Sequence, residues 1–145
     1  MSKTYEEVAY EVDNMADGLN YPIDQGIKKI VTALRLLGFP TESSCEGHMD
    51  RGLQYPWIQF IAQDLDDVKL KEVNKKERKR LIELAEEFRK DVNPDFKYSI
   101  LDVDDLSSFR LAPEEDIVYG KPNEETKDRC QKSFDEFANF LISKA

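Results

Sequence analysis

One strongly amphipathic segment, Lys75 to Val92, constrains the fold most, because it separates two groups of strand-like segments. Its apolar residues recur at the spacing of one helix face, and charged residues fill the other positions. The apolar members are Leu81, Leu84, Ala85, Phe88 and Val92. Asn93-Pro94 is expected to end the helix, since proline disfavours helical backbone in the residue before it. The strands before and after this helix therefore form separate groups.

Three further segments have helical periodicity. The first covers residues 5–18 and is expected to stop at its final glycine. The second begins near Pro22 or Asp24, because proline suits the first position of a helix, and ends at Gly38. The last spans about residues 124–143. Its expected inward residues are Cys130, Phe134, Phe137, Ala138 and Leu141.

Four short segments are typical of strands. The clearest is Trp57 to Ala62, where apolar residues alternate and Gln59 falls on the opposite face. The others are Thr41 to Cys45, Lys97 to Val103 and Phe109 to Ala112, the last two joined by a turn rich in Asp and Ser. The order α, α, β, β, α, β, β, α lacks the regular alternation of a parallel sheet. We expect a single α+β domain over residues 1–145, with a mostly antiparallel sheet of about four strands in two hairpins and about four helices mainly on one face.

The net charge of the chain limits the kinds of molecule that it is expected to bind. The chain has 145 residues and a net charge of -9. Such acidity argues against binding duplex nucleic acid or an anionic membrane surface, since both interactions depend on basic residues. It permits a basic protein partner, and it leaves homo-oligomer formation open. The N-terminal residues lack the apolar core of a signal peptide, so we expect a cytoplasmic location, where the two cysteines are free thiols.

The segment from Thr41 to Trp57 is the best candidate for a functional site. It combines a thiol, the only histidine of the chain, carboxylates, an arginine and two glycines, followed by two aromatic residues. Gly47 permits a tight turn whose N–H groups converge, a geometry that suits an anion. We expect the ligand-binding residues to be Ser44, Cys45, Glu46, Gly47, His48, Arg51, Tyr55, Trp57 and Arg110.

Several chemistries remain open for these residues. Cys45 beside His48 could form an activated thiolate, and Glu46 or His48 could serve as a general base. A metal site at Cys45, His48 and Asp50 would need a fourth ligand from elsewhere. The segment could equally be a structural turn, with Cys45 as a small buried apolar residue.

Two further charged clusters have alternative interpretations. Asp102, Asp104 and Asp105 could hold a cation, although a solvated turn is the simpler interpretation because the spacing of an EF-hand is absent. The basic residues from Lys75 to Arg80 could bind an acidic partner or simply form a solvated start to their helix.

The same segment carries a resemblance to known proteins. Leu34 to Gly38 followed by Thr41-Glu42-Ser43-Ser44-Cys45-Glu46-Gly47-His48 resembles small uncharacterised bacterial and phage proteins with a Thr-x-x-Ser-Cys-x-Gly-His motif. More distantly, Ser43 to Gly47 is similar to the Ser-Cys-Ser-Gly-Arg motif of the tRNA wybutosine-synthesising protein 3 family. That likeness implies an α+β fold and S-adenosylmethionine-dependent methyl transfer, with His48 where the family has arginine and Glu46 where it has serine.

Three functions follow as hypotheses. The first is a protein that binds a small anionic or nucleotide-like ligand at the Ser-Cys-Glu-Gly-His loop, such as a phage or bacterial regulatory or sequestering protein. The second is an enzyme, either a methyltransferase or a cysteine-dependent transferase or hydrolase. The third is an acidic protein-interaction domain.

Overall fold

The structure is a computed structural model that describes residues 3–14, 25–45, 56–63, 65–96, 98–114 and 124–145. Its helices are α1 (Tyr5–Asp13), α2 (Lys28–Leu36), α3 (Asp67–Asp91) and α5 (Glu124–Ser143), and a short 3-10 helix, η1 (Gln25–Ile27), precedes α2. Its strands are β1 (Thr41–Cys45), β2 (Trp57–Phe60), β3 (Tyr98–Val103) and β4 (Ser108–Pro113).

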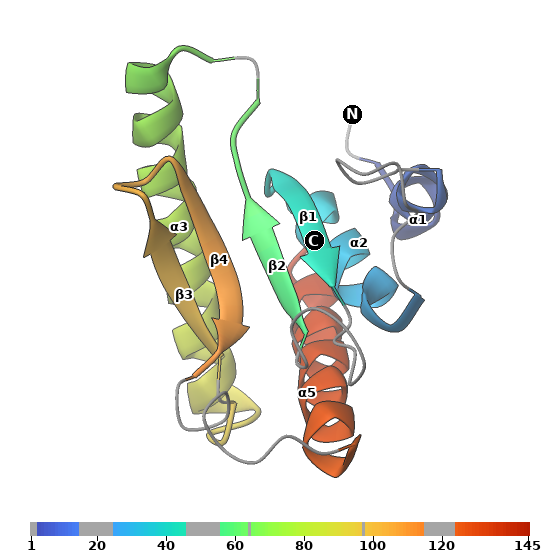
Figure 1. The fold of residues 1–145 in the computed structure, drawn as a ribbon. Coiled ribbons are helices and arrows are strands. Elements are labelled where there is room, and N and C mark those ends of the chain that lie inside the picture. Colours follow the sequence, from blue (N-terminus) through green and yellow to red (C-terminus); the bar gives the residue numbers. More distant parts are fainter. Residues whose placement is uncertain (1–2, 15–24, 46–55, 64, 97, 115–123) are drawn as a thin grey trace.

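The four strands form one antiparallel sheet in the order β1-β2-β4-β3. Helices α2, α3 and α5 lie behind the sheet, and α1 packs beside α2 at the β1 end (Figure 1). The opposite face of the sheet carries no helix of the described chain (Figure 1). The expected α+β fold, with two hairpins and helices mainly on one face, is therefore confirmed.

The core lies between the sheet and the helices. Strand alternation sends Ile58 and Phe60 of β2 and Phe109 and Leu111 of β4 into it, all fully buried. Phe60 and Phe109 face each other across the strand pair and stack with ring centroids 4.7 Å apart. From the helix side come further buried aromatic and aliphatic residues, namely Val31, Leu34, Leu81, Phe88, Phe134, Phe137 and Leu141. The inward residues expected for α5 are all buried, Cys130 among them as a free thiol.

Helix α3 begins two turns earlier than its apolar stripe indicated. Asp66 caps it by accepting a hydrogen bond from the backbone N–H of Lys69 at 2.9 Å. The additional turns are mostly exposed, as Val68 shows with 70% exposure, so they carry no apolar period. At the other end Val92 is the C-cap and is 53% exposed, which corrects its expected inward position.

The buried Asn74 of α3 ties the helix to the sheet. Its Oδ1 accepts from the backbone N–H of Ala62 at 3.1 Å, and its Nδ2 donates to the carbonyls of Leu106 and Ser107 at 2.8 and 3.1 Å. These bonds fix the β3–β4 turn, in which Asp104, Asp105 and Leu106 have φ angles of 49°, 54° and 67°. Left-handed backbone is unfavourable for residues other than glycine, so the turn depends on such external contacts.

Arginines cover the backbone acceptors at both edges of the sheet. On β3, Arg78 donates to the carbonyl of Ile100 at 2.8 Å, and Arg89 donates to those of Phe96 at 3.0 Å and Tyr98. On β1, Nη1 of Arg35 donates to the carbonyl and hydroxyl oxygens of Thr41 at 2.9 and 2.8 Å. An edge strand with unpaired backbone groups is a template for association with another strand, and these contacts protect both edges.

The chain repeats the order helix, strand, strand. The units α2-β1-β2 and α3-β3-β4 each supply one edge strand and one central strand, and the central strands pair antiparallel. Two arginines of α3 lie over the phenylalanines that precede the first strand of each unit, Arg80 over Phe39 at 3.8 Å and Arg89 over Phe96 at 5.5 Å. The two units therefore share the same order of elements, and Gln59 and Arg110 pair where their central strands meet.

No helix in the described ranges has the length and apolar character needed to cross a membrane.

Candidate ligand-binding site on the open face of the sheet

The expected site residues divide between the described sheet and a segment outside it. Glu46, Gly47, His48, Arg51 and Tyr55 lie outside the described residues. Cys45 ends β1 with its backbone opposite Trp57, and its side chain is likewise outside the description. The remaining three, Ser44, Trp57 and Arg110, belong to the sheet.

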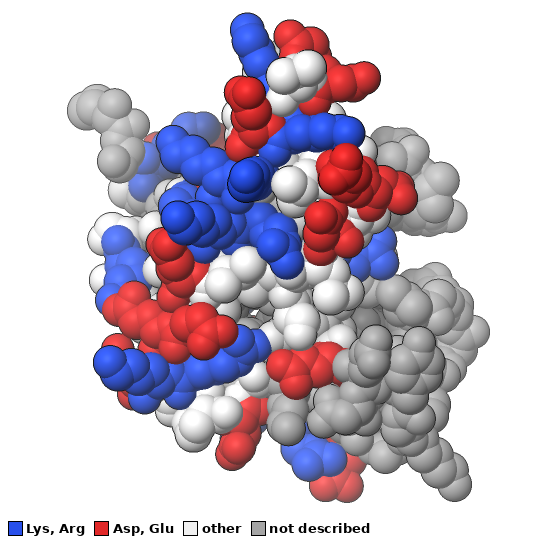
Figure 2. Space-filling view, turned by 90° about the vertical axis from the view of Figure 1, so that its left-hand side faces the viewer, with Lys and Arg blue, Asp and Glu red and all other residues white. Residues whose placement is uncertain are grey.

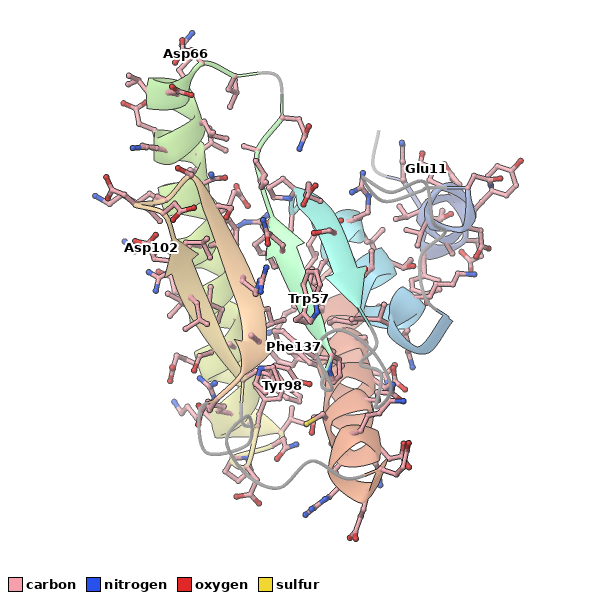
Figure 3. The ribbon with its side chains drawn as sticks, in the orientation of Figure 1. Glu11, Trp57, Asp66, Tyr98, Asp102 and Phe137 are labelled. Atoms are coloured by element: carbon pink, nitrogen blue, oxygen red, sulfur yellow. The ribbon has the colours of Figure 1, made fainter. Side chains whose placement is uncertain are left out.

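Strand alternation places Trp57 and Arg110 on the face of the sheet that the helices leave open. Ile58 and Phe60 of β2 point into the core, so Trp57 and Gln59 point away from it. Arg110 is the cross-strand partner of Gln59 and shares that face. Figure 3 shows Trp57 in front of the sheet, with Phe137 and the helices behind. The only charged residue that alternation puts on this face of β2 and β4 is Arg110.

Arg110 makes two contacts that hold its guanidinium against β2. Its Cζ lies 4.5 Å from the centre of the Trp57 ring, within the range of a cation–π interaction. Its Nη2 donates to Oε1 of Gln59 at 2.6 Å. Both contacts come from β2, the strand next to β4, which carries Arg110.

The Nε of Arg110 is buried and has no hydrogen-bond partner among the described residues. A buried donor without a partner costs about 1–3 kcal/mol, and more when the group is charged. The guanidinium of Arg110 is thus positioned by two neighbours and has an Nε that is screened from solvent and unsatisfied by the described residues.

Ser44 occupies a different environment. It pairs with Ile58 in the β1–β2 register, so it shares the helix-covered face of the sheet and not that of Arg110. Its Oγ is buried and also lacks a partner in the described part of the chain. Ser44 and Arg110 thus do not converge on one point, in contrast to the single loop site that the sequence predicts.

Metal binding finds no support in the described ranges, where no three His, Cys, Asp or Glu residues are grouped as ligands. The three carboxylates of Asp102, Asp104 and Asp105 thus do not form such a group. Asp102 instead accepts from the backbone N–H of Leu106 at 2.7 Å, and Asp105 forms an ion pair with Lys71 at 3.6 Å. The possible site at Cys45, His48 and Asp50 lies outside the described side chains.

The molecule is not uniformly acidic on its surface. Between Lys69 and Arg80, α3 carries seven Lys and Arg residues and only two Glu. Figure 2 looks onto the side of the molecule that carries α3 and β3 and shows Lys and Arg gathered in its upper part, with Asp and Glu around them. Both arginines of this stretch make hydrogen bonds within the fold. Arg78 donates to the carbonyl of Ile100 in β3, and Arg80 donates to the carbonyl of Leu37 at 2.9 Å.

Two residues that make notable polar contacts are not among the expected site residues. The sequence indicates only that Gln59 faces away from the core. Arg35, which donates to Thr41, lies in a helix that has no local signal of function. Gln59 becomes significant through its pairing with Arg110, which is 51 positions away in sequence. A polar residue that interrupts an apolar strand was the one signal that pointed to it.

Comparisons with protein-family models, with curated proteins and with solved structures found no match. The resemblance of the Thr41 to His48 motif stays a prediction.

Proposed function

We propose that the protein binds a small anionic, nucleotide-like ligand on the open face of the sheet, beside the β1–β2 connection. The observation that carries the proposal is the guanidinium of Arg110, which lies on the Trp57 ring and retains a buried Nε without a partner in the described chain. A phosphate or carboxylate oxygen is the acceptor that pairs best with this group. A ligand oxygen that accepted a hydrogen bond from Nε would remove the free-energy cost of this unsatisfied donor, which would favour binding.

Trp57 supplies the second element of recognition. It is partly exposed on the same face, and its ring is already in contact with a planar cation. Stacking of a base on an aromatic side chain contributes about 1–3 kcal/mol and tolerates any base, because every base has a π-face. A ligand with an anionic group and a planar ring would therefore engage both residues.

The loop residues of the original hypothesis complete the proposal. In the sequence this segment joins β1, which ends at Cys45, to β2, which begins at Trp57; it contains Glu46, Gly47, His48, Arg51 and Tyr55. His48 and Arg51 would add positive charge for the anion. No contact of the described residues specifically favours the enzyme or the protein-interaction hypothesis.

The proposal can be tested by fluorescence, because Trp57 is the only tryptophan in the chain. Nucleoside monophosphates, the parent nucleosides and inorganic phosphate would each be titrated into the purified protein. We expect the monophosphates to change the emission of Trp57 saturably and the nucleosides to bind at least about tenfold more weakly, since they lack the anion.

Variants locate the site. Arg110→Lys keeps the charge but loses the planar fork, and we expect it to weaken nucleotide binding about tenfold. Arg129→Lys makes the same change on α5 and is the matched control, with no change in affinity expected. Equilibrium dialysis provides an independent readout, and no retention of any nucleotide by the unmodified protein would refute the proposal.

A further inference from the structure

A pocket of about 390 Å³ lies on a different part of the molecule, between α1 and the connection from α2 to β1. This volume is within the range of small-molecule sites. Its lining includes Lys3, Glu11, Arg35, Leu36, Gly38 and Pro40. The pocket shares no residue with the Trp57 and Arg110 site, and it adjoins the edge strand β1 through Pro40.

The chain builds the floor of this pocket by ending α2 with a glycine turn. Gly38 has a φ of 86°, its N–H donates to the carbonyl of Arg35, and the N–H of Phe39 donates to that of Leu34, both at 3.0 Å. This is the hydrogen-bond pattern that closes helices at a left-handed glycine. The turn lets Phe39 enter the core while the backbone at Gly38 stays exposed at the pocket.

Arg35 is held in the pocket with one edge of its guanidinium already used. Nη1 makes both bonds to Thr41, whereas Nε and Nη2 make no hydrogen bond with the described residues. The N–H groups of Nε and Nη2 point in parallel and form the fork that binds a carboxylate through two bonds. Anchoring one edge reduces the side-chain entropy that a ligand must remove when it binds the other edge.

The charges in the pocket set the charge of its ligand. Lys3 forms an ion pair with Glu11, so these two groups neutralise each other. Arg35 has no carboxylate partner in the described chain, which leaves one positive charge uncompensated. A group with a single negative charge balances it, whereas a dianion such as a phosphate monoester would leave one negative charge uncompensated.

Part of the remaining wall is apolar. Leu36 of α2 and Pro40 are partly exposed and line the same space as Arg35, whereas Val8 of α1 lies beneath the surface with 3% exposure. We propose that this pocket binds a monocarboxylate with an attached apolar group, with the carboxylate on the Nε and Nη2 fork of Arg35 and the apolar group against Leu36 and Pro40. Such a group occurs both in free aromatic or aliphatic acids and at the C-terminus of a peptide.

The experiment is a titration followed by amide chemical shifts in ¹H–¹⁵N spectra of the full chain. The probes are 3-phenylpropionate, which represents a free acid, and N-acetylphenylalanine, which represents a peptide C-terminus. Their neutral amides are the matched control ligands. We expect both acids to shift the amide signals of Leu36, Gly38 and Phe39, and the tighter of the two identifies the source. Equal shifts from the amides, or shifts confined to residues outside the pocket, would overturn the proposal.

Arg35→Lys is the decisive variant. Lysine keeps the charge and can still donate to Thr41, but it cannot form the two parallel bonds, so we expect binding of the tighter acid to weaken about tenfold. Lys79→Gln removes an exposed cation from α3 and should leave affinity unchanged. Unchanged binding by Arg35→Lys would exclude the fork as the recognition element, provided that thermal unfolding shows the variant to be folded.

Discussion

Asn74 connects a helix, a strand end and a turn through one buried amide. Its three hydrogen bonds satisfy the N–H of Ala62 and the carbonyls of Leu106 and Ser107. An alanine at this position would leave those groups without partners inside the fold, while the gain in helix propensity is smaller.

We predict that Asn74→Ala lowers the free energy of unfolding by about 3 kcal/mol, because buried polar groups lose their partners. Urea denaturation measures the change. Asn139→Ala, at an exposed position of α5, is the control and should alter stability by less than about 0.5 kcal/mol. A loss as small as that of the control would mean that water replaces the amide at little cost.

In the left-handed β3–β4 turn, one substitution is expected to raise the free energy of unfolding, in contrast to Asn74→Ala. Asp105 has a φ of 54° and its side chain is 92% exposed, so its ion pair with Lys71 contributes little. Asp105→Gly removes the steric cost of left-handed backbone but adds flexibility to the unfolded chain.

We predict a net stabilisation by Asp105→Gly of about 0.5 kcal/mol. Asp95→Gly is the comparison, because Asp95 is exposed and has no positive φ, so it should lose stability through added flexibility alone. Thermal unfolding of the two variants should shift in opposite directions. A decrease for both would show that the turn stores no appreciable strain.

Among the secondary-structure elements, β3 depends most on side chains from a neighbouring helix. Arg78 and Arg89 project from α3 to the free edge of β3. They donate hydrogen bonds to the carbonyls of Tyr98 and Ile100 in the strand and of Phe96 just before it. Both guanidiniums are partly buried against the strand, and each charge-assisted bond contributes about 1.5–3 kcal/mol.

We predict that the double variant Arg78→Gln and Arg89→Gln exposes the β3 edge and promotes self-association. Light scattering coupled to size-exclusion chromatography would show a larger concentration-dependent mass than for the unmodified chain. The control is Lys75→Gln with Lys79→Gln, which makes the same change of charge on exposed positions of α3. Equal behaviour of the two double variants would attribute any association to charge and not to the edge.

The elements that the sequence predicts well are those with an apolar period. Helix α5 and the strand pairs are found where Phe134, Phe137, Ile58 and Phe60 repeat at helical or strand spacing. The first turns of α3 were missed because they pack little, and their start is set by the cap at Asp66. A period reports burial, so an exposed helical turn leaves no such signal.

The candidate site could be predicted only in part. Trp57 and Arg110 were both expected, but their contact depends on the pairing of β2 with β4, which local patterns do not specify. The same limit hid the pocket at Arg35, since its walls come from α1 and α2 and meet only through helix packing. Tertiary contacts between elements distant in sequence were the information that was lacking.

At the scale of the whole molecule, two buried ionisable groups of the described chain make the free energy of unfolding depend on pH in the alkaline range. Burial raises the pKa of Tyr98 well above its ordinary value of 10.0, and the neighbouring Cys130 raises it further. Burial likewise raises the pKa of the Cys130 thiol above 9.0, against smaller opposing effects of Tyr98 and Arg129. The folded chain therefore keeps both groups protonated at a pH where the unfolded chain has begun to release its protons.

We predict that stability is retained below about pH 9 and falls as the pH rises through the range where the unfolded groups ionise, with a slope approaching about 1.4 kcal/mol per pH unit for each group. Urea denaturation between neutral and alkaline pH measures the slope. Tyr98→Phe should flatten it, because phenylalanine has no proton to release. Tyr10→Phe, at a side chain that is 72% exposed, should leave it unchanged. An identical slope in both variants would place the alkaline loss elsewhere.

The repeated order of the two helix–strand–strand units also has an implication for how such a sheet can be assembled. Each unit contributes one edge strand and one central strand, and the two central strands run antiparallel. A two-fold dimer brings the same surface of each subunit together, so a chain of only one such unit could build this four-stranded sheet by pairing with its own copy. Joining two such units in one chain removes the requirement that both halves be identical, so Trp57 can occur in one unit and Arg110 in the other, on the strands where the units meet.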